Sequence, residues 1–403
     1  ALYGKKIQKE KSKLLNLTEL ENFQHISSSG MCKLCTNHCQ LTINTFTNGK
    51  KFITGNKCER GAGKKLQSDL PNMVAYKNQL FNSIPLKGGG RARIGLPRAL
   101  NIYEMLPFWA ELFCSLGCDI VLSKVSSRNI YMKGQNTIPS DTVCYPAKLV
   151  HGHIIDLLEK DLDAIFYPCM SYTFDEGISD NCYNCPIVAY YPELIQANIP
   201  DIEKTHFLYP HLGIENHKLL AERMYEEFKN IIPKLSKKEM EKAVENAFKS
   251  YYEYREAVRQ EGSRVLKFAE ENNYPVIILA SRPYHIDPEI NHGLDKLLNS
   301  LQFIVVTEDA LYPVEGKLTI KILNQWGFHA RMYNAAKYVS QHKNMELVHF
   351  GCGIDAITTD EIQDILRSNN KLYTQLKIDE VSNLGAAKIR LRSLQATMKE
   401  REM

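Results

Sequence analysis

The sequence lacks both a long apolar run and an excess of charge of one sign. Across its 403 residues, no uninterrupted stretch reaches the roughly 18 apolar residues that a membrane-spanning helix needs. Its 50 basic and 46 acidic residues leave a formal charge of only +4, which is too small to indicate a nucleic-acid groove or a membrane-binding surface. Residues 1–14 are basic but have no apolar core, so they lack the pattern of a signal peptide. We therefore expect a cytoplasmic protein with no nucleic-acid or membrane partner.

A phosphate-binding loop is also missing. No Gly-x4-Gly-Lys-Ser/Thr sequence occurs, and the glycines at 61–63 have neither its spacing nor its hydroxyl group. The glycine run at 88–90 precedes an expected strand instead of following one, so it is interpreted as a linker. Any nucleotide hydrolysis linked to this protein must therefore belong to another domain or to a partner.

Cysteine, by contrast, is abundant, with 11 residues in a chain that carries no secretion signal. In a reducing compartment, clustered cysteines are more typical of metal binding or redox chemistry than of disulfides. Four of them lie close together near the amino terminus: Cys32, Cys35, Cys39 and Cys58. Four thiolates can surround either a Zn²⁺ ion or a 4Fe–4S cluster. The spacing predicts a metal site but leaves the choice between the two open.

Strand-like and helix-like segments alternate through the rest of the chain. Short apolar segments typical of strands occur at 93–97, 118–123, 162–167, 187–191 and 206–209, and again at 276–280, 303–306 and 347–350, the last expected strand. Helical patterns lie between them, and such alternation predicts parallel sheets covered by helices. The expected organisation is an arm at 1–30, a metal-binding unit at 31–86, a first α/β lobe at 91–212, a helical connection at 213–272, and a second α/β lobe with a carboxy-terminal helix at 273–403.

Several cysteines fall where loops of such sheets meet. Cys144 precedes an expected helix, and Cys169 and Cys352 each follow an expected strand. Loops at the carboxyl ends of parallel strands line the functional crevice, so these three thiols can converge from distant parts of the chain. Cys182 and Cys185 form a further pair close to Cys169 and could add ligands to the same site.

The other two cysteines have a different setting. Cys114 and Cys118 have apolar neighbours within a helix–strand pair, which favours simple burial.

Four segments together resemble the acyl-CoA dehydratase activase-related family. They are Ile94-Gly-Leu-Pro-Arg-Ala-Leu100, Cys144-Tyr-Pro-Ala-Lys-Leu-Val-His-Gly-His153, Ser281-Arg-Pro-Tyr-His-Ile-Asp-Pro-Glu-Ile-Asn-His-Gly293 and Phe350-Gly-Cys-Gly-Ile-Asp355. That family is similar to the cluster-bearing subunits of 2-hydroxyacyl-CoA dehydratases and to double-cubane cluster proteins. Because related chains can follow activase domains in one polypeptide, the initial Ala is consistent with a fragment of a longer protein.

The resemblance implies two Rossmann-like lobes with an iron–sulfur cluster between them, supplied with electrons by an ATP-dependent activase. Cys144, Cys169 and Cys352 match the dehydratase-type ligand positions. Cys182 and Cys185 leave room for an 8Fe–9S double cubane in place of a single 4Fe–4S cluster, although a double cubane would need a sixth thiolate. Since activases of this type are dimers, the resemblance also implies a homodimer.

Three histidines are candidates for moving protons to a bound substrate. His153 follows Cys144 on the same expected helix, and His285 and His292 follow the strand at 276–280. Reductive chemistry needs protons as well as electrons, and histidine can supply them. The sequence thus favours an iron–sulfur oxidoreductase that reduces a small molecule. Dehydratase-type radical elimination from an acyl-CoA, and a non-catalytic zinc-bound scaffold, are the alternatives.

Overall fold

The computed structural model describes residues 15–33, 39–56, 61, 63, 68–314, 320–352, 355–377 and 384–402. The chain divides into two compact units, Ala1–Leu66 and Gln67–Met403. Within the described residues, no helix combines the length and the apolar character needed to cross a membrane.

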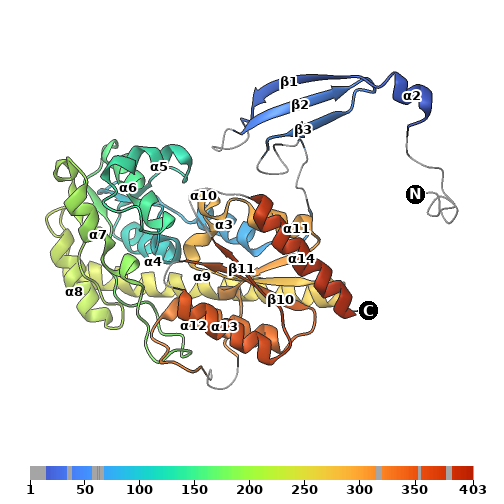
Figure 1. Ribbon diagram of the computed structural model, residues 1–403. Coiled ribbons are helices and arrows are strands. Elements are labelled where there is room, and N and C mark those ends of the chain that lie inside the picture. The colour runs from blue at the N-terminus through green and yellow to red at the C-terminus, as the bar shows by residue number, and fades with distance from the viewer. Residues whose placement is uncertain are drawn as a thin grey trace. The chain divides into compact units, whose positions relative to one another are not determined.

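The first unit is a small antiparallel sheet preceded by a short helix. Helix α2 spans Leu17–Glu21, and strands β1 (His25–Met31), β2 (Gln40–Phe46) and β3 (Lys51–Thr54) pair in the order β1-β2-β3 (Figure 1). The backbone N–H of Cys32 donates to the carbonyl of Cys39 at 2.9 Å, so the two buried cysteines extend the β1–β2 pairing by one step. Cys35 and Cys58, the other half of the expected four-thiolate site, lie outside the described residues.

The second unit begins with helix α3 (Met73–Ser83) and continues with the first α/β lobe. The lobe consists of β4 (Arg93–Leu96), α4 (Ile102–Ser115), β5 (Asp119–Leu122), α5 (Arg128–Gly134), η1 (Gln135–Thr137), α6 (Tyr145–Leu158), β6 (Ala164–Phe166), α7 (Pro186–Asn198), η2 (Ile202–Lys204) and β7 (His206–Leu208). Its four strands are parallel, in the order β5-β4-β6-β7. Helix α3, which the sequence analysis grouped with the cysteine unit, packs against β9 of the second lobe.

Two helices, α8 (His217–Phe228) and α9 (Lys237–Glu271), connect the lobes. A capping box starts α9, because the Ser236 hydroxyl accepts the Glu239 N–H while the Glu239 carboxylate accepts the Ser236 N–H. One face of this 35-residue helix is buried, and the helix packs on α4 of the first lobe and on β9 of the second. It therefore fixes one lobe against the other.

The second lobe repeats the architecture of the first. It consists of β8 (Val276–Ala280), η3 (Pro283–Ile286), α10 (Pro288–Asn291), α11 (Leu294–Ser300), β9 (Ile304–Thr307), η4 (Glu308–Ala310), α12 (Gly327–Ser340), β10 (Met345–Gly351), α13 (Ala356–Ser368), β11 (Tyr373–Lys377) and α14 (Leu384–Glu402). All five β8 residues are buried, as expected for a parallel strand covered on both faces. In Figure 1, α12 and α13 lie on one face of this sheet, and α11 and α14 on the other.

Both sheets have the same strand order relative to the chain. The second sheet has the order β9-β8-β10-β11, which matches the β5-β4-β6-β7 order of the first. In each lobe the second strand pairs on one side of the first strand and the third strand pairs on its other side, so the order of the strands switches there. Ligand sites in open parallel sheets lie outside the carboxyl ends of the strands at this point. The candidate crevices therefore lie beyond β4 and β6 in one lobe, and beyond β8 and β10 in the other.

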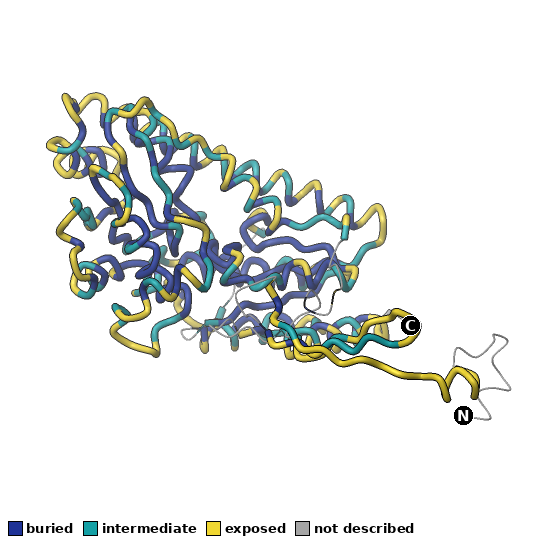
Figure 2. The backbone as a smooth tube through the Cα atoms, turned by 90° about the horizontal axis from the view of Figure 1, so that it is seen from above, coloured by how far each residue is buried: buried dark blue, intermediate teal, exposed yellow. Residues whose placement is uncertain are grey.

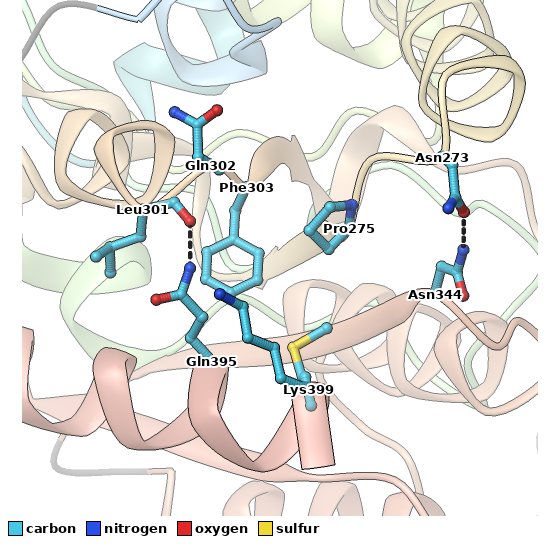
Figure 3. A pocket seen from close by; sticks show the side chains of 9 residues that line it. Asn273, Pro275, Leu301, Gln302, Phe303, Asn344, Gln395 and Lys399 are labelled. Carbon is cyan, nitrogen blue, oxygen red and sulfur yellow. Dashed lines mark hydrogen bonds between the residues drawn. The ribbon is translucent and has the colours of Figure 1, made fainter. Parts of the chain in front are cut away.

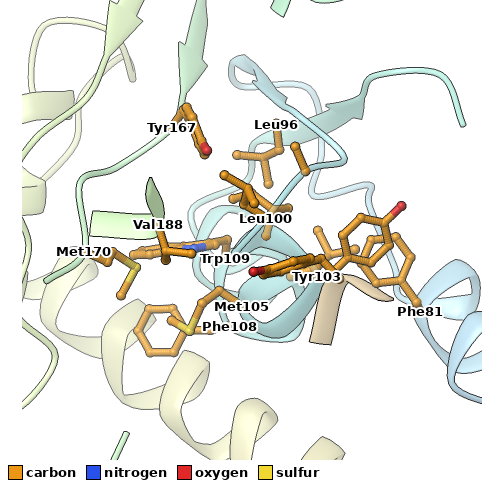
Figure 4. Packing of buried hydrophobic residues seen from close by; sticks show 14 of the residues in the cluster. Phe81, Leu96, Leu100, Tyr103, Met105, Phe108, Trp109, Tyr167, Met170 and Val188 are labelled. Atoms are coloured by element: carbon orange, nitrogen blue, oxygen red, sulfur yellow. The ribbon is translucent and has the colours of Figure 1, made fainter. Parts of the chain in front are cut away.

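One continuous apolar core runs through both lobes. Trp109 of α4 packs against Phe166 of β6 with ring centroids 4.9 Å apart, and Figure 4 shows Met170 and Val188 beside the same indole. Leu279 of β8 belongs to the same cluster of buried side chains. In Figure 2 the buried backbone follows the strands of the second unit, while exposed positions lie on the outer helix turns and loops. The shared core holds the crevices of the two lobes in a fixed relation.

A buried ion cluster reinforces the contact between the lobes. Arg255 on α9 contacts Glu176 at 2.9 Å and Asp309 at 3.5 Å, and Arg331 on α12 contacts Glu104 on α4 at 2.7 Å. Glu104 and Glu176 belong to the first lobe, and Asp309 and Arg331 to the second. Each ion of the lobes has a partner in the other lobe or on α9, and a substitution that removed one partner would leave a buried charge unpaired, at a cost of roughly 3–5 kcal/mol.

The structure confirms the α/β class and the two parallel sheets joined by helices, but it corrects two expectations. The strand predicted at 187–191 is wrong, since these residues belong to helix α7. Pro186 occupies the first helical position, and Val188, Tyr191 and Ile195 are buried at helical spacing. In addition, 347–350 is not the last strand, because β11 follows it at the sheet edge with only Leu376 buried.

Candidate functional site

Two cysteines cap helices and a third directly follows a strand, all on the carboxyl edges of the two sheets. Cys144 is the N-cap of α6 and Cys185 is the N-cap of α7, each followed by a proline in the first helical turn. Cys352 directly follows β10, shortly before α13 begins. In a strand–helix–strand crossover, the connecting helix starts at the carboxyl edge of the sheet, so all three thiols reach that edge. A helix N-terminus carries partial positive charge, which favours a thiolate or another anion there.

The same three thiols lie in one neighbourhood between the lobes, close enough for their charges to act on the same buried groups. Burial raises the pKa of Cys144 to about 11, and the nearby Cys185 and Cys352 raise it further. The pKa of Tyr284, on the second lobe, lies well above its usual range because of burial and because these same three cysteines are near it. Since Cys144 and Cys185 belong to one lobe and Cys352 to the other, the site is shared between the lobes.

A buried ion pair holds the Cys352 loop in place. Arg282, which follows β8, donates to the Asp355 carboxylate through Nη1 at 3.0 Å and through Nη2. The same carboxylate accepts the backbone N–H of Cys352 at 2.7 Å. Although burial opposes its ionisation, the nearby imidazoles of His329 and His349 and the charge of Arg282 hold the pKa of Asp355 well below its usual range. Asp355 is therefore a fixed anion that links the ends of β8 and β10.

The guanidinium of Arg282 also contributes charge to the site. It is one of the groups that lower the pKa of Cys144, and the side chain is almost fully buried. A permanent positive charge at this depth favours thiolates over thiols. Arg282 was not among the candidate residues from the sequence, although it lies within the segment 281–293 that carries the family resemblance.

A hydrogen-bonded chain lies near Cys144. The Tyr191 hydroxyl lies 3.0 Å from His151 Nε2, and His151 Nδ1 lies 2.8 Å from the Thr137 hydroxyl. Burial lowers the pKa of His151 to about 4, so its ring is neutral at neutral pH. Burial and the neighbouring Cys144 raise the pKa of Tyr191 above its usual value, so its hydroxyl keeps its proton. The arrangement can hold a transferable proton beside the thiols.

The three histidines chosen from the sequence have different surroundings. His153 is fully buried, with its ring nitrogens 2.8 Å from the Ser123 hydroxyl and 3.0 Å from the Ser126 hydroxyl, and burial lowers its pKa to about 3. His285 is buried and accepts the Arg282 backbone N–H at Nδ1. His292 is partly exposed and stacks on Tyr145 with ring centroids 6.3 Å apart. Of these, His285 lies nearest to the Arg282–Asp355 pair along the chain.

Cys169 borders the same buried region, because burial raises the pKa of the Tyr167 hydroxyl and the thiol of Cys169, like those of Cys144 and Cys185, lies close enough to raise it further. Cys169 is buried; burial raises its pKa to about 11, and the neighbouring charge that adds to this effect is Glu193 and not another cysteine. The Cys182 thiol lies 3.6 Å from the Ser179 hydroxyl, and burial raises its pKa. The structure thus places Cys185 near both Cys144 and Cys352, which the spacing of strand ends did not single out, and Cys169 on the side of Cys144 and Cys185.

A separate hollow of about 490 Å³ lies at the other edge of the second sheet (Figure 3). Its lining includes Pro275, Phe303 and Asn344, which immediately precede β8, β9 and β10. The side chain of Gln395 on α14 donates to the Leu301 carbonyl at 2.6 Å across it. Because the cysteines lie beyond the carboxyl ends of the strands, this hollow is not part of the cysteine site.

A protein-family model described as "CoA enzyme activase uncharacterised domain" matches residues 93–311. The chain belongs to this family. The match confirms the resemblance to activase-related acyl-CoA dehydratase proteins. It spans the first lobe, α9 and the start of the second lobe, and thus includes Cys144, Cys185 and Arg282. No curated protein matches the chain.

Two solved structures are similar to this CoA enzyme activase family member over most of its length. The laminin-binding protein Lbp of Streptococcus pyogenes is 11% identical, with a TM-score of 0.22, over 77% of this chain and 97% of that one. The C-terminal domain of glucosamine-fructose-6-phosphate aminotransferase from Francisella tularensis is also 11% identical, with a TM-score of 0.18, over 81% and 90%. Superpositions this weak carry no argument about fold or function.

Proposed function

We propose that this chain is an iron–sulfur protein of the CoA dehydratase activase system. In this proposal it receives low-potential electrons from an ATP-dependent activase and reduces a small substrate at a cluster held by Cys144, Cys185 and Cys352. The observation that supports the proposal is that these three thiols come from both lobes and all lie close enough to the buried Tyr284 to add to the rise that burial causes in the pKa of its hydroxyl. The family match supports a role beside an activase.

The donor set fits an iron–sulfur cluster. Thiolates are the ligands that such clusters use, and three of them leave room for a fourth ligand or for substrate. Arg282 and the N-termini of α6 and α7 would offset the negative charge of a thiolate-bound cluster. A bound cluster would supply one-electron redox chemistry, and its potential would depend on this charge and on burial.

The residues around the thiols hold the partly buried sulfurs in position. Asp355 fixes the backbone at Cys352 and holds Arg282 beside Cys144. The Tyr284 ring is buried next to all three cysteines, and its hydroxyl stays protonated because burial raises its pKa. The Tyr191–His151 pair can return a proton to the site after a proton has been used.

A second candidate is dehydratase-type radical elimination of water from an acyl-CoA. The reference to CoA enzymes in the family description favours it. The two functions share the same cysteine site and differ in the substrate. Dependence of turnover on an added 2-hydroxyacyl-CoA would select the dehydratase, and reduction of a small molecule without CoA would select the reductase.

The test is anaerobic purification followed by measurement of iron, acid-labile sulfide and zinc per chain. EPR spectra would be recorded before and after reduction, first with a strong chemical reductant and then with an activase and ATP. About four irons per chain would indicate one cubane, and about eight would indicate a double cubane or a second cluster at the amino-terminal cysteines. Zinc without sulfide would contradict the proposal and leave a scaffold protein.

A further inference from the structure

Cys169 and His211 lie side by side beyond the ends of two neighbouring strands. Cys169 follows β6 and His211 follows β7, and these strands are parallel partners. The pairing continues past the strands, since the Cys169 N–H donates to the Pro210 carbonyl and the Leu212 N–H donates to the Cys169 carbonyl, each at 3.0 Å. The backbone thus fixes the two residues next to each other, although they are far apart in sequence.

Glu193 completes a group of three possible metal ligands. It lies on α7, the helix that connects β6 to β7. The Cys169 sulfur, a His211 ring nitrogen and a Glu193 carboxylate oxygen all lie within 4.8 Å of one another. His211 Nε2 is 2.8 Å from Glu193 Oε1. Three different elements therefore direct one sulfur, one nitrogen and one oxygen atom toward the same point.

The three ligands differ in their access to solvent. Cys169 is only 1% exposed, whereas the side chains of Glu193 and His211 are 52% and 50% exposed. A metal ion could reach the buried sulfur past the two exposed groups and would keep one side open to water. Arg223 on α8 donates to the His211 carbonyl at 2.7 Å, which restrains the backbone of the histidine.

From this geometry we infer that Cys169, Glu193 and His211 form a mononuclear metal site suited to Zn²⁺, with ligands that the three-cysteine site does not use. One thiolate, one imidazole and one carboxylate are ligands that Zn²⁺ accepts, and three protein ligands with an open position are typical of zinc sites that bind water or a further ligand. Thiolate ligation disfavours Mg²⁺ and Ca²⁺.

The test measures metal content of the full chain, purified anaerobically, incubated with excess Zn²⁺ and separated from unbound metal. His211→Ala and Glu193→Gln should each bind about one zinc fewer per chain than the wild type, with iron unchanged. Both side chains are half exposed, so these variants are expected to fold. His206→Ala is the matched control, because His206 is exposed on β7, near the site but outside it, and its zinc content should equal that of the wild type.

Cobalt provides a second readout that depends on the sulfur. Co²⁺ bound at the site should give a sulfur-to-cobalt absorption in the near ultraviolet that is lost in Cys169→Ser. Unchanged zinc content in both His211→Ala and Glu193→Gln would overturn the inference. Loss of iron, in place of zinc, from Cys169→Ser would also overturn it and would assign Cys169 to the cluster.

Discussion

Asp355→Asn is expected to destabilise the second unit strongly while changing almost no side-chain volume. The substitution removes the negative charge that Arg282 contacts through both terminal nitrogens. Arg282 is 2% exposed, so its guanidinium cannot turn to water when its partner is lost. The amide can still accept the Cys352 N–H. The change therefore isolates the charge from the hydrogen bond that positions the loop.

The expected loss follows from the burial of the pair. Breaking a buried ion pair by removing one partner costs roughly 3–5 kcal/mol, because an uncompensated charge stays buried. Total stabilities of about 5–15 kcal/mol make this a large fraction. By contrast, Asp364→Asn removes the partner of Lys321 at the surface, where both side chains are about half exposed or more. Exposed pairs contribute about 0–1 kcal/mol, so this variant is the matched control.

The assay is urea unfolding of wild type, Asp355→Asn and Asp364→Asn, followed by tryptophan fluorescence. The midpoint of Asp355→Asn should fall well below the other two. A double variant, Arg282→Met with Asp355→Leu, should recover much of the loss, because it removes both charges. If Asp355→Asn unfolds at the same urea concentration as Asp364→Asn, the buried pair does not have the energetic role that its geometry implies.

Two further predictions concern other parts of the second unit. Burial and the adjacent Asp309 raise the pKa of Glu308 to about 7, above its ordinary value of 4.5. The unfolded chain therefore binds fewer protons between these pH values, and this group makes the wild type less stable as pH rises through that window. Glu308→Gln should remove that contribution, so the urea midpoints of the variant and the wild type should diverge between pH 5 and 7.5. If the two midpoints change with pH in parallel, the argument is refuted. A Cβ on Gly152 would lie 1.7 Å from the Ile130 carbonyl oxygen. Gly152→Ala should therefore force α5 and α6 apart and lower the free energy of unfolding by about 1–3 kcal/mol, measured by thermal or urea unfolding. Gly30→Ala, where a Cβ meets no atom within 4 Å, should show no clash-related loss, and equal stabilities of the two variants would contradict the close packing.

The fold class could be predicted because parallel strands that are buried on both faces have continuous apolar sequences. Residues 276–280 are all buried in β8, and the run alone indicates a strand. The segment at 187–191 looked similar, but Pro186 starts a helix there, and local composition did not decide between the two states. Strand β11 escaped prediction because an edge strand needs little burial. The shared strand order of the two lobes has no counterpart in a sequence repeat, since strand order depends on tertiary packing.

The sequence indicated which cysteines were candidates for the site but not which of them lie near one another. Strand ends and a helix start drew attention to Cys144, Cys169 and Cys352, whereas Cys185 was a candidate only as half of a Cys-x2-Cys pair, so nothing in the spacing placed it beside Cys144 and Cys352. That placement depends on how α7 crosses between β6 and β7. The Arg282–Asp355 ion pair could not be predicted from the sequence either, because the two residues are 73 positions apart and come into contact only when β8 and β10 pair.

The most direct test of the account is the iron and acid-labile sulfide content of single cysteine variants purified without oxygen. Cys144→Ser, Cys185→Ser and Cys352→Ser should each lose most of the cluster iron of the second unit. Cys114→Ser should keep it, because that thiol lies against the Pro85 carbonyl, 3.7 Å away, at the opposite end of α4 from the site. Iron and sulfide contents that are equal in Cys185→Ser and Cys114→Ser would contradict the central claim that three thiols from two lobes hold a redox cluster.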